Sequence, residues 1–280
     1  MQILDVIRPS EKIQIMDVGA SAINEQPVYK VLLDNDLAHL NAFEGDERQI
    51  EGIRQAFGDK ATVFREFLYD GRDATVYFTT PASGMTSLLQ PNPKTLKFFN
   101  GFEIFGRVER TATIPTKRMD DIEGLPNVEF IKMDIQGAEL TVLQNGRERL
   151  RDCLAIQLEV SFVNLYHGQP SFGEVDVWMR SQGMIPHRFL GIKPWVIAPT
   201  VFNNNFRIPG NQLMEADVVY MKDPRELKSF TDTQIRKAIL LAHYCFGSID
   251  LVVHFILELE RRGNVPAETH RHYMQSLLAK

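Results

Sequence analysis

Short apolar segments alternate with amphipathic helical segments over most of this 280-residue chain. Such alternation predicts an α/β fold, in which helices cover both faces of a mostly parallel sheet. The expected strands are residues 13–19, 39–44, 61–68, 128–135, 154–162, 185–190 and 216–221, with further extended segments at 74–80 and 110–122. The expected helices between them are residues 26–36, 46–57, 137–145 and 172–182.

Turn and capping residues mark several boundaries. Asp46 is a predicted N-cap for the helix at 46–57, and Gly58 is its predicted stop. Asp70 and Gly71 predict a tight turn ahead of the extended segment at 74–80. Residues 81–110 are irregular and rich in Gly, Ser, Asn and Phe, which is typical of a lid with short helices.

The pattern changes after Pro224. Residues 231–246, 248–262 and 266–279 have helical periodicity, without strand candidates between them. The segment at 248–262 carries a broad apolar stripe, as expected for a packed face or a homodimer contact. We therefore predict a main domain over residues 1–223 and a helical appendage over residues 224–280, whose helices are candidates for joining two copies of the chain.

Composition narrows the class of protein. A formal net charge of −5 and the lack of a long basic run argue against nucleic acid as the main partner. Cys153 and Cys245 are too few for a disulfide framework or a zinc site, and they suit a reducing compartment. The start of the chain does not read as a signal peptide, and no segment has the length of a membrane span. These features predict a soluble, cytoplasmic protein.

The segment at 128–135 holds the most informative charges. Lys132 and Asp134 lie two residues apart in an apolar strand, so they share one face of it. Charges are costly in a strand that is buried on both sides and therefore need a reason. Ligands of open α/β sheets bind beyond the carboxyl ends of the strands, where we expect Asp134.

The turn after the first strand suits a ligand that approaches the backbone closely. It has Asp17, Gly19, Ser21 and Asn24, whereas a dinucleotide fingerprint would place glycines at 19, 21 and 24. The broken pattern disfavours a nicotinamide cofactor. It is more compatible with S-adenosyl-L-methionine, which lacks phosphates.

Glu44 ends the second strand, a couple of dozen residues after that turn. A carboxylate there can accept hydrogen bonds from both hydroxyls of a ribose. It would repel the 2′-phosphate of NADP. The pair of positions therefore indicates a nucleoside cofactor without that phosphate.

At these residues the chain resembles the FkbM-type, S-adenosyl-L-methionine-dependent methyltransferases. The resemblance rests on Asp17-Val-Gly-Ala20, Ala42-Phe-Glu44 and, above all, on residues 130–139 with the sequence FIKMDIQGAE. It covers about residues 13–223. Two departures stand out: the first turn reads Gly-Ala-Ser-Ala-Ile, and Gln136 occupies the position where the family usually has Glu.

The resemblance implies a class I, Rossmann-like sheet of seven strands, mostly parallel, with the last strand antiparallel. It also implies that the first turn faces the methionine and ribose of the cofactor, that Glu44 holds the ribose, and that the end of the third strand lies near the adenine. The implied cofactor-binding residues are Asp17, Gly19, Ala20, Ser21, Glu44, Gly45, Leu68, Tyr69 and Asp134.

Methyl transfer to a hydroxyl requires an aligned acceptor and a group that takes its proton. Asp134 is the first candidate for this base, and Glu159, at the end of the next expected strand, is the second. Lys132 is the expected ion partner of one of them. The sequence leaves open whether two such carboxylates instead hold Mg²⁺, which would acidify the hydroxyl directly.

The expected acceptor site lies in two loops. His167 follows the fifth strand in a loop that should overhang the same rim, and imidazole is a common proton acceptor near neutral pH. Residues 81–106 and 195–212 supply aromatic rings and amides, which suit a polyhydroxylated acceptor. The leading hypothesis is O-methylation of a sugar, glycan or polyketide-like small molecule. The alternatives are an NAD-dependent oxidoreductase and a non-catalytic nucleoside-binding scaffold.

Overall fold

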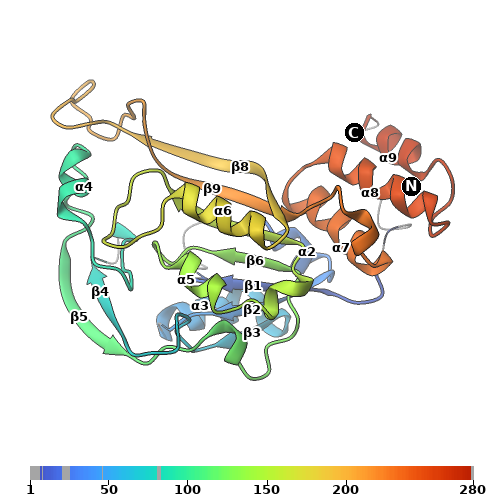
Figure 1. The fold of residues 1–280 in the computed structure, drawn as a ribbon, viewed down its shortest axis with the longest axis horizontal. Helices are drawn as coiled ribbons and strands as arrows, with labels where there is room; N and C mark the ends of the chain where they lie inside the picture. Colours follow the sequence, from blue (N-terminus) through green and yellow to red (C-terminus); the bar gives the residue numbers. More distant parts are fainter. Residues whose placement is uncertain (1–6, 8, 21–25, 46, 81–82, 279–280) are drawn as a thin grey trace.

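The computed structural model describes residues 7, 9–20, 26–45, 47–80 and 83–278. The strands of the main sheet are β1 (Ile13–Val18), β2 (Ala38–Phe43), β3 (Ala61–Phe64), β6 (Phe130–Met133), β7 (Ala155–Ser161), β8 (Met184–Trp195) and β9 (Gln212–Lys222). Their order is β3-β2-β1-β6-β7-β9-β8 (Figure 1). The first five pair in parallel, and β9 runs antiparallel to both of its neighbours. The predicted seven-stranded sheet with an antiparallel last strand is thus confirmed.

Alternate residues along each strand enter two different cores, one on each face of the sheet. In β1, Ile13 and Ile15 belong to the first core, and Met16 and Val18 to the second. The helices α2 (Lys30–Asp34) and α3 (Glu47–Phe57) contribute to the first core, and α5 (Glu139–Gln144) and α6 (Phe172–Ser181) to the second. Short 3-10 turns complete the connections at η1 (Gly58–Lys60), η3 (Met119–Asp121), η4 (Arg149–Asp152) and η5 (Leu227–Ser229).

A separate unit stands beyond the carboxyl ends of the parallel strands. It contains a two-stranded ribbon, β4 (Ala74–Thr79) and β5 (Val108–Ile114), and the helix α4 (Pro93–Phe98). We call residues 83–106 and 195–212 the cap. Phe99 and Phe102 of the cap share a third, small core with Tyr166, from the loop after β7. Figure 1 places α4 and the ribbon at one end of the sheet.

The C-terminal helices lie at the opposite end (Figure 1). They are α7 (Asp232–Leu240), the π-helical turn η6 (Leu241–Cys245), α8 (Ile249–Arg261) and α9 (Thr269–Leu278). Ile239 and Phe255 from these helices belong to the same core as Phe130 and Leu154, at the starts of β6 and β7. The boundary at residue 223 stays a prediction, but the hydrophobic core runs across it.

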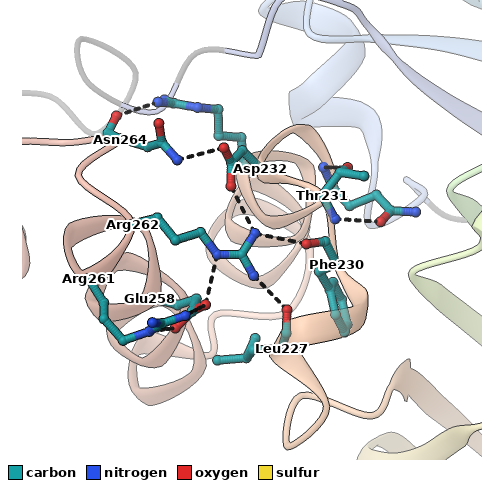
Figure 2. Close-up of polar contacts among 10 residues, drawn as sticks. Leu227, Phe230, Thr231, Asp232, Glu258, Arg261, Arg262 and Asn264 are labelled. Carbon is teal, nitrogen blue, oxygen red and sulfur yellow. Dashed lines mark hydrogen bonds and ion pairs between the residues drawn. The ribbon is translucent and has the colours of Figure 1, made fainter.

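Arg262 fastens the C-terminal helices to the segment that leads into them (Figure 2). Its guanidinium donates to the carbonyl oxygens of Phe230, at 2.8 Å, and Leu227, at 2.6 Å. It also pairs with Asp232, at 2.8 Å, and with Glu258, at 2.7 Å. One cation therefore joins α7, α8 and the turn before them.

Most of the predicted elements are confirmed, with bounds that differ by a few residues. The larger differences are that α2, β3, β5 and β6 are shorter than expected, with the 3-10 turn η3 inside the segment expected to be extended, and that β8 and β9 extend further toward the cap. The turn at Asp70 and Gly71 is present, but the strand that follows pairs with β5 in its own ribbon. Asp46, the expected cap of α3, lies outside the described residues. No helix in the described part of the chain combines the length and apolar character needed to cross a membrane.

Candidate functional site

One face of the sheet changes from apolar to polar toward the carboxyl ends of its parallel strands. Asp17, Lys132 and Gln157 are register partners on the adjacent strands β1, β6 and β7. Each lies two residues after an apolar core residue, so the three side chains share the face of the first core. A cavity of about 880 Å³ lies over this row. Its lining is Asp17, Gly19, Ala20, Gln26, Pro27, Val28, Tyr29, Lys30, Ile53, Ala56, Phe57, Lys132, Asp134, Gln157, Leu190, Gly191, Lys193 and Asp217.

The turn after β1 brings two backbones into contact. Gly19 has a φ of +79°, and a Cβ atom built on it would lie 2.3 Å from the carbonyl oxygen of Asp134. Any side chain there would collide with the chain leaving β6, so only glycine suits the position. The tips of β1 and β6 therefore meet at the cavity. Ala20 is buried beside them, and Ser21 lies outside the described residues.

Asp17 is the buried anion of this row. Its side chain accepts a short hydrogen bond from the Tyr29 hydroxyl, and its Oδ1 lies 3.6 Å from Lys132 Nζ. Burial raises the pKa of Asp17, and the charge of Lys132 opposes that shift. Burial also disfavours the charged form of Lys132, but Asp17, Asp134 and Asp217 outweigh it and raise the lysine pKa.

The structure corrects one expectation about Lys132. In the described chain its ion pair is with Asp17, on the neighbouring strand, rather than with Asp134 or Glu159. The reason is the register of β1 and β6, which places Asp17 directly opposite Lys132. Asp134 lies one residue beyond the end of β6 and is exposed.

Gln136 joins the two predicted catalytic carboxylates. Its Nε2 donates to Asp134 Oδ1 at 2.8 Å and to Glu159 Oε2 at 3.0 Å. Its Oε1 accepts from the buried Tyr166 hydroxyl at 2.8 Å. The side chain thus points inward, between the ends of β6 and β7. The sequence alone did not assign a role to Gln136 or Tyr166.

Glu159 belongs to a second charged group, at the ends of β7, β8 and β9. Lys193 Nζ lies 2.7 Å from Glu159 Oε1 and 3.1 Å from Glu215 Oε1. Burial raises the pKa of Glu159 well above its ordinary value, and the charges of Asp134 and Glu215 add to the shift. Lys193 opposes it without cancelling it. The raised pKa makes this carboxyl a better proton acceptor than an ordinary glutamate.

The other predicted cofactor residues line a different part of the rim. Glu44 is half-buried at the end of β2, and a Cβ atom on Gly45 would lie 2.1 Å from the Phe67 ring. Leu68 is buried in the second core, and Tyr69 packs against that core. These four residues are not in the lining of the cavity. Their proposed contacts with a cofactor stay predictions.

His167 lies in the loop after β7, as expected, with an exposed side chain. Its backbone nitrogen donates to the carbonyl oxygen of Gln90 at 2.8 Å, which ties this loop to the cap. The neighbouring Tyr166, rather than His167, contacts Gln136, the residue that joins the carboxylate pair. The local sequence feature that could have marked Tyr166 as a site residue is an aromatic ring in a polar loop.

Sequence reasoning also missed Lys193, Glu215 and Asp217, on β8 and β9. Asp217 interrupts an apolar strand as Lys132 does, and that signal was available. Lys193 carried no comparable signal, because its place opposite Glu215 depends on the register of β8 and β9. Within residues 26–45, 47–80 and 83–278, no three His, Cys, Asp or Glu residues are grouped as a metal site.

The strand order, with β9 antiparallel between β7 and β8, defines a class I, Rossmann-like methyltransferase fold. The chain belongs to the methyltransferase FkbM domain family, whose model matches residues 17–186. This match confirms the resemblance drawn from the motifs and makes the protein a methyltransferase.

Known relatives are distant. The 2-O-methyltransferase NoeI of Sinorhizobium fredii (strain NBRC 101917 / NGR234) is 26% identical over 180 residues, which are 60% of this chain and 71% of that protein. A precorrin-6y C5,15-methyltransferase from Geobacter metallireducens GS-15 has a TM-score of 0.38 and 10% identity, over 78% of this chain and 85% of that one. Magnesium protoporphyrin IX methyltransferase from Synechocystis PCC 6803, with bound SAM, has a TM-score of 0.38 and 8% identity, over 76% and 71%.

Proposed function

We propose that this protein transfers a methyl group from S-adenosyl-L-methionine to a hydroxyl of a sugar, glycan or other small molecule. The observation that carries the proposal is the position of Asp134. This exposed carboxylate lines the cavity and directly follows β6, where the backbone meets the turn at Gly19. A proton acceptor thereby stands beside the place where the fold family binds its cofactor.

The cavity has features that fit this cofactor. Asp17 Oδ1 is buried with its ion partner Lys132 Nζ 3.6 Å away, beyond hydrogen-bond distance, and the buried Gln157 Oε1 has no hydrogen-bond partner among the described residues. Buried acceptors without donors favour a ligand that brings N–H or O–H groups. We assign the turn at Gly19 and Ala20 to the amino-acid end of the cofactor and Glu44 to its ribose. When bound, the cofactor supplies a methyl group already activated by a sulfonium.

The chain's own residues would then prepare the acceptor. As the C–O bond forms and the C–S bond breaks, the hydroxyl proton passes to a carboxylate, for which Asp134 is the first candidate. Glu159 is the second, and its raised pKa favours proton uptake. Lys193 and Gln136 hold Glu159 in place. Alignment of acceptor and methyl group contributes much of the rate in such transfers.

The cap supplies the features of an acceptor site. Trp195 lies edge-on to Phe102, with ring centroids 4.9 Å apart, and to Phe105, at 6.4 Å. Exposed Asn203 and Asn204 lie in the same part of the cap. Rings and amides together suit sugar faces and hydroxyls. The name of the relative NoeI, a 2-O-methyltransferase, supports an oxygen acceptor.

Calorimetry tests the cofactor. We expect the protein to bind S-adenosyl-L-methionine and its demethylated product, and not NAD. Binding of NAD alone would replace the proposal with the oxidoreductase alternative.

Asp134→Asn tests the base. We expect turnover to fall by about 100-fold or more, the usual range for a lost general base, while donor affinity is kept. The matched control is Asp121→Asn, an exposed carboxylate of η3 that is not in the lining of the cavity. Unchanged turnover in the Asp134 variant would remove this residue from the reaction.

A further inference from the structure

Gln136 has an unusual backbone for its residue type. Its φ is +58°, and the following Gly137 has a φ of +100°. Non-glycine residues rarely adopt this conformation, because Cβ crowds the following carbonyl. A glutamine in this conformation points to a role for its side chain that glycine could not fill.

The contacts of that side chain use most of its hydrogen-bonding capacity. The two Nε2 hydrogens are directed to Asp134 and Glu159, and Oε1 receives the hydroxyl of Tyr166. The backbone carbonyl of Gln136 also accepts from Ser87 Oγ at 2.7 Å. Four partners, from four different segments, therefore converge on one residue.

The Tyr166 hydroxyl determines the orientation of the side-chain amide of Gln136. Its pKa is raised by burial and by Glu159 and Glu215, so the hydroxyl keeps its proton and acts as a donor. This hydroxyl lies 2.8 Å from Oε1 of Gln136 and 3.4 Å from the carbonyl oxygen of Met85, and its hydrogen bond to Oε1 turns Nε2 toward the two acids. Gln169 in turn braces Tyr166, because its Oε1 accepts from the backbone nitrogens of Leu165, at 2.7 Å, and Tyr166, at 3.2 Å.

We infer that Gln136 is a positioning residue, which holds the carboxylates of Asp134 and Glu159 in one fixed geometry, with Tyr166 fixing the orientation of its amide. The inference rests on the proposed roles of these two acids in O-methyl transfer. A neutral amide can donate to both carboxylates at once, which an ionised glutamate at this position could not do.

The charges around Glu159 come from every strand near it. Asp134 follows β6, Glu215 lies on β9, and Lys193 on β8 contacts Glu159 directly. Asp217 on β9 is the register partner of Glu159, and Lys132 on β6 is the register partner of Gln157, so both charges lie on the same sheet face as Glu159. Beside these charged groups, Nε2 of Gln136 is the neutral donor that stabilises the charged form of Glu159. It lies between Glu159 and Asp134 and donates to both.

The test is a titration of Glu159 that needs no acceptor. In protein with ¹³C-labelled glutamate carboxyls, the Glu159 signal is assigned with Glu159→Gln and followed against pH in the wild type, Gln136→Leu and Tyr166→Phe. Gln136→Leu removes the donor. Tyr166→Phe removes one oxygen atom, which allows the amide to turn its Oε1 toward Glu159.

We expect both variants to raise the apparent pKa of Glu159, by roughly one unit for Gln136→Leu, because a hydrogen bond to the charged form is lost. Tyr220→Phe is the matched control. It removes a buried hydroxyl that bonds Asp176 at 3.2 Å in the second core, and it should leave Glu159 unchanged.

An unchanged Glu159 pKa in both Gln136→Leu and Tyr166→Phe would overturn the inference, even if both proteins melt at a lower temperature. Calorimetry with S-adenosyl-L-methionine on the same samples separates the two proposals. Failure of the wild type to bind this donor would sink the proposed function, whereas the titration would still decide the role of Gln136.

Discussion

At the scale of single residues, the rim combines several carboxyls that differ in how far burial shifts their pKa values. Glu139, at the start of α5, is the clearest case outside the proposed chemistry. Its Oε1 accepts from the backbone nitrogens of Ile135, at 2.9 Å, and Gly137, at 3.2 Å. Burial nevertheless raises its pKa to about 7. Glu139 thus braces the turn that carries Asp134 and Gln136.

This shift predicts a pH dependence of stability. The folded protein holds a proton on Glu139 up to pH about 7, whereas an unfolded glutamate releases it near about 4.3. The folded state therefore binds more protons in this window, and stability falls as pH rises through it. Glu139→Gln cannot lose a proton, so we expect it to gain up to about 3 kcal/mol on the wild type between pH 5 and 8.

Urea unfolding at several pH values between these limits measures the effect. Glu123→Gln, at an exposed position, is the control and should follow the wild type. If the free energies of unfolding of Glu139→Gln and the wild type changed with pH in parallel, burial of this carboxyl would not make stability depend on pH.

At the scale of elements, the approach of the β1 turn to the end of β6 is the feature that shapes the cavity. It depends on Gly19, because a Cβ atom there would lie 2.3 Å from the Asp134 carbonyl oxygen. Gly58 also has a positive φ, of +54°, but nothing lies within 4 Å of a Cβ built on it. A comparison of substitutions at these two glycines therefore separates the effect of the close backbone approach, which only Gly19 has, from the strain of a positive φ, which both have.

We therefore expect Gly19→Ala to cost more than Gly58→Ala. The strain of a positive φ accounts for about 1–2 kcal/mol at either position. Gly19→Ala should lose further stability and also weaken binding of S-adenosyl-L-methionine, because the two strand tips must separate. Denaturant unfolding and calorimetry give both quantities. Equal costs for the two variants, with unchanged donor affinity, would contradict this reading of the turn.

At the scale of the whole molecule, the cap and the C-terminal helices occupy opposite ends of the sheet. The lining of the cavity includes no residue after Asp217. The C-terminal helices instead complete the first core, so we assign them to stability rather than to chemistry. Their use as a homodimer contact stays a prediction.

Arg262 is the residue on which this packing most visibly depends (Figure 2). Arg262→Ala would remove a donor from two carbonyl oxygens and from two carboxylates, which would keep Arg261 and Asn264 as their other partners, so we expect a loss of about 2–4 kcal/mol. Arg271→Ala is the control, since Arg271 is exposed and its ion pair among the described residues is with Glu268, just before α9. Thermal and urea unfolding compare the two. A similar small effect in both would mean that Arg262 does not fasten the helices.

Much of the fold was predictable from local pattern. Strand and helix periods are properties of short segments, and the charges of Lys132 and Asp134 are visible as breaks in an apolar run. The position of Asp134 beyond a strand end followed from the same pattern. Family motifs then added the seven-stranded sheet with its antiparallel last strand, which no local period contains.

The sequence by itself therefore determined the alternating elements, the two-sided burial of the sheet and the strand end at which the acids lie, because side-chain period acts over a few residues. Only the tertiary structure decided that Lys132 pairs with Asp17, that Lys193 joins Glu159 to Glu215, and that Gln136 points inward. These contacts join strands far apart in the chain, and they depend on register and on a left-handed turn that the order of residues does not display.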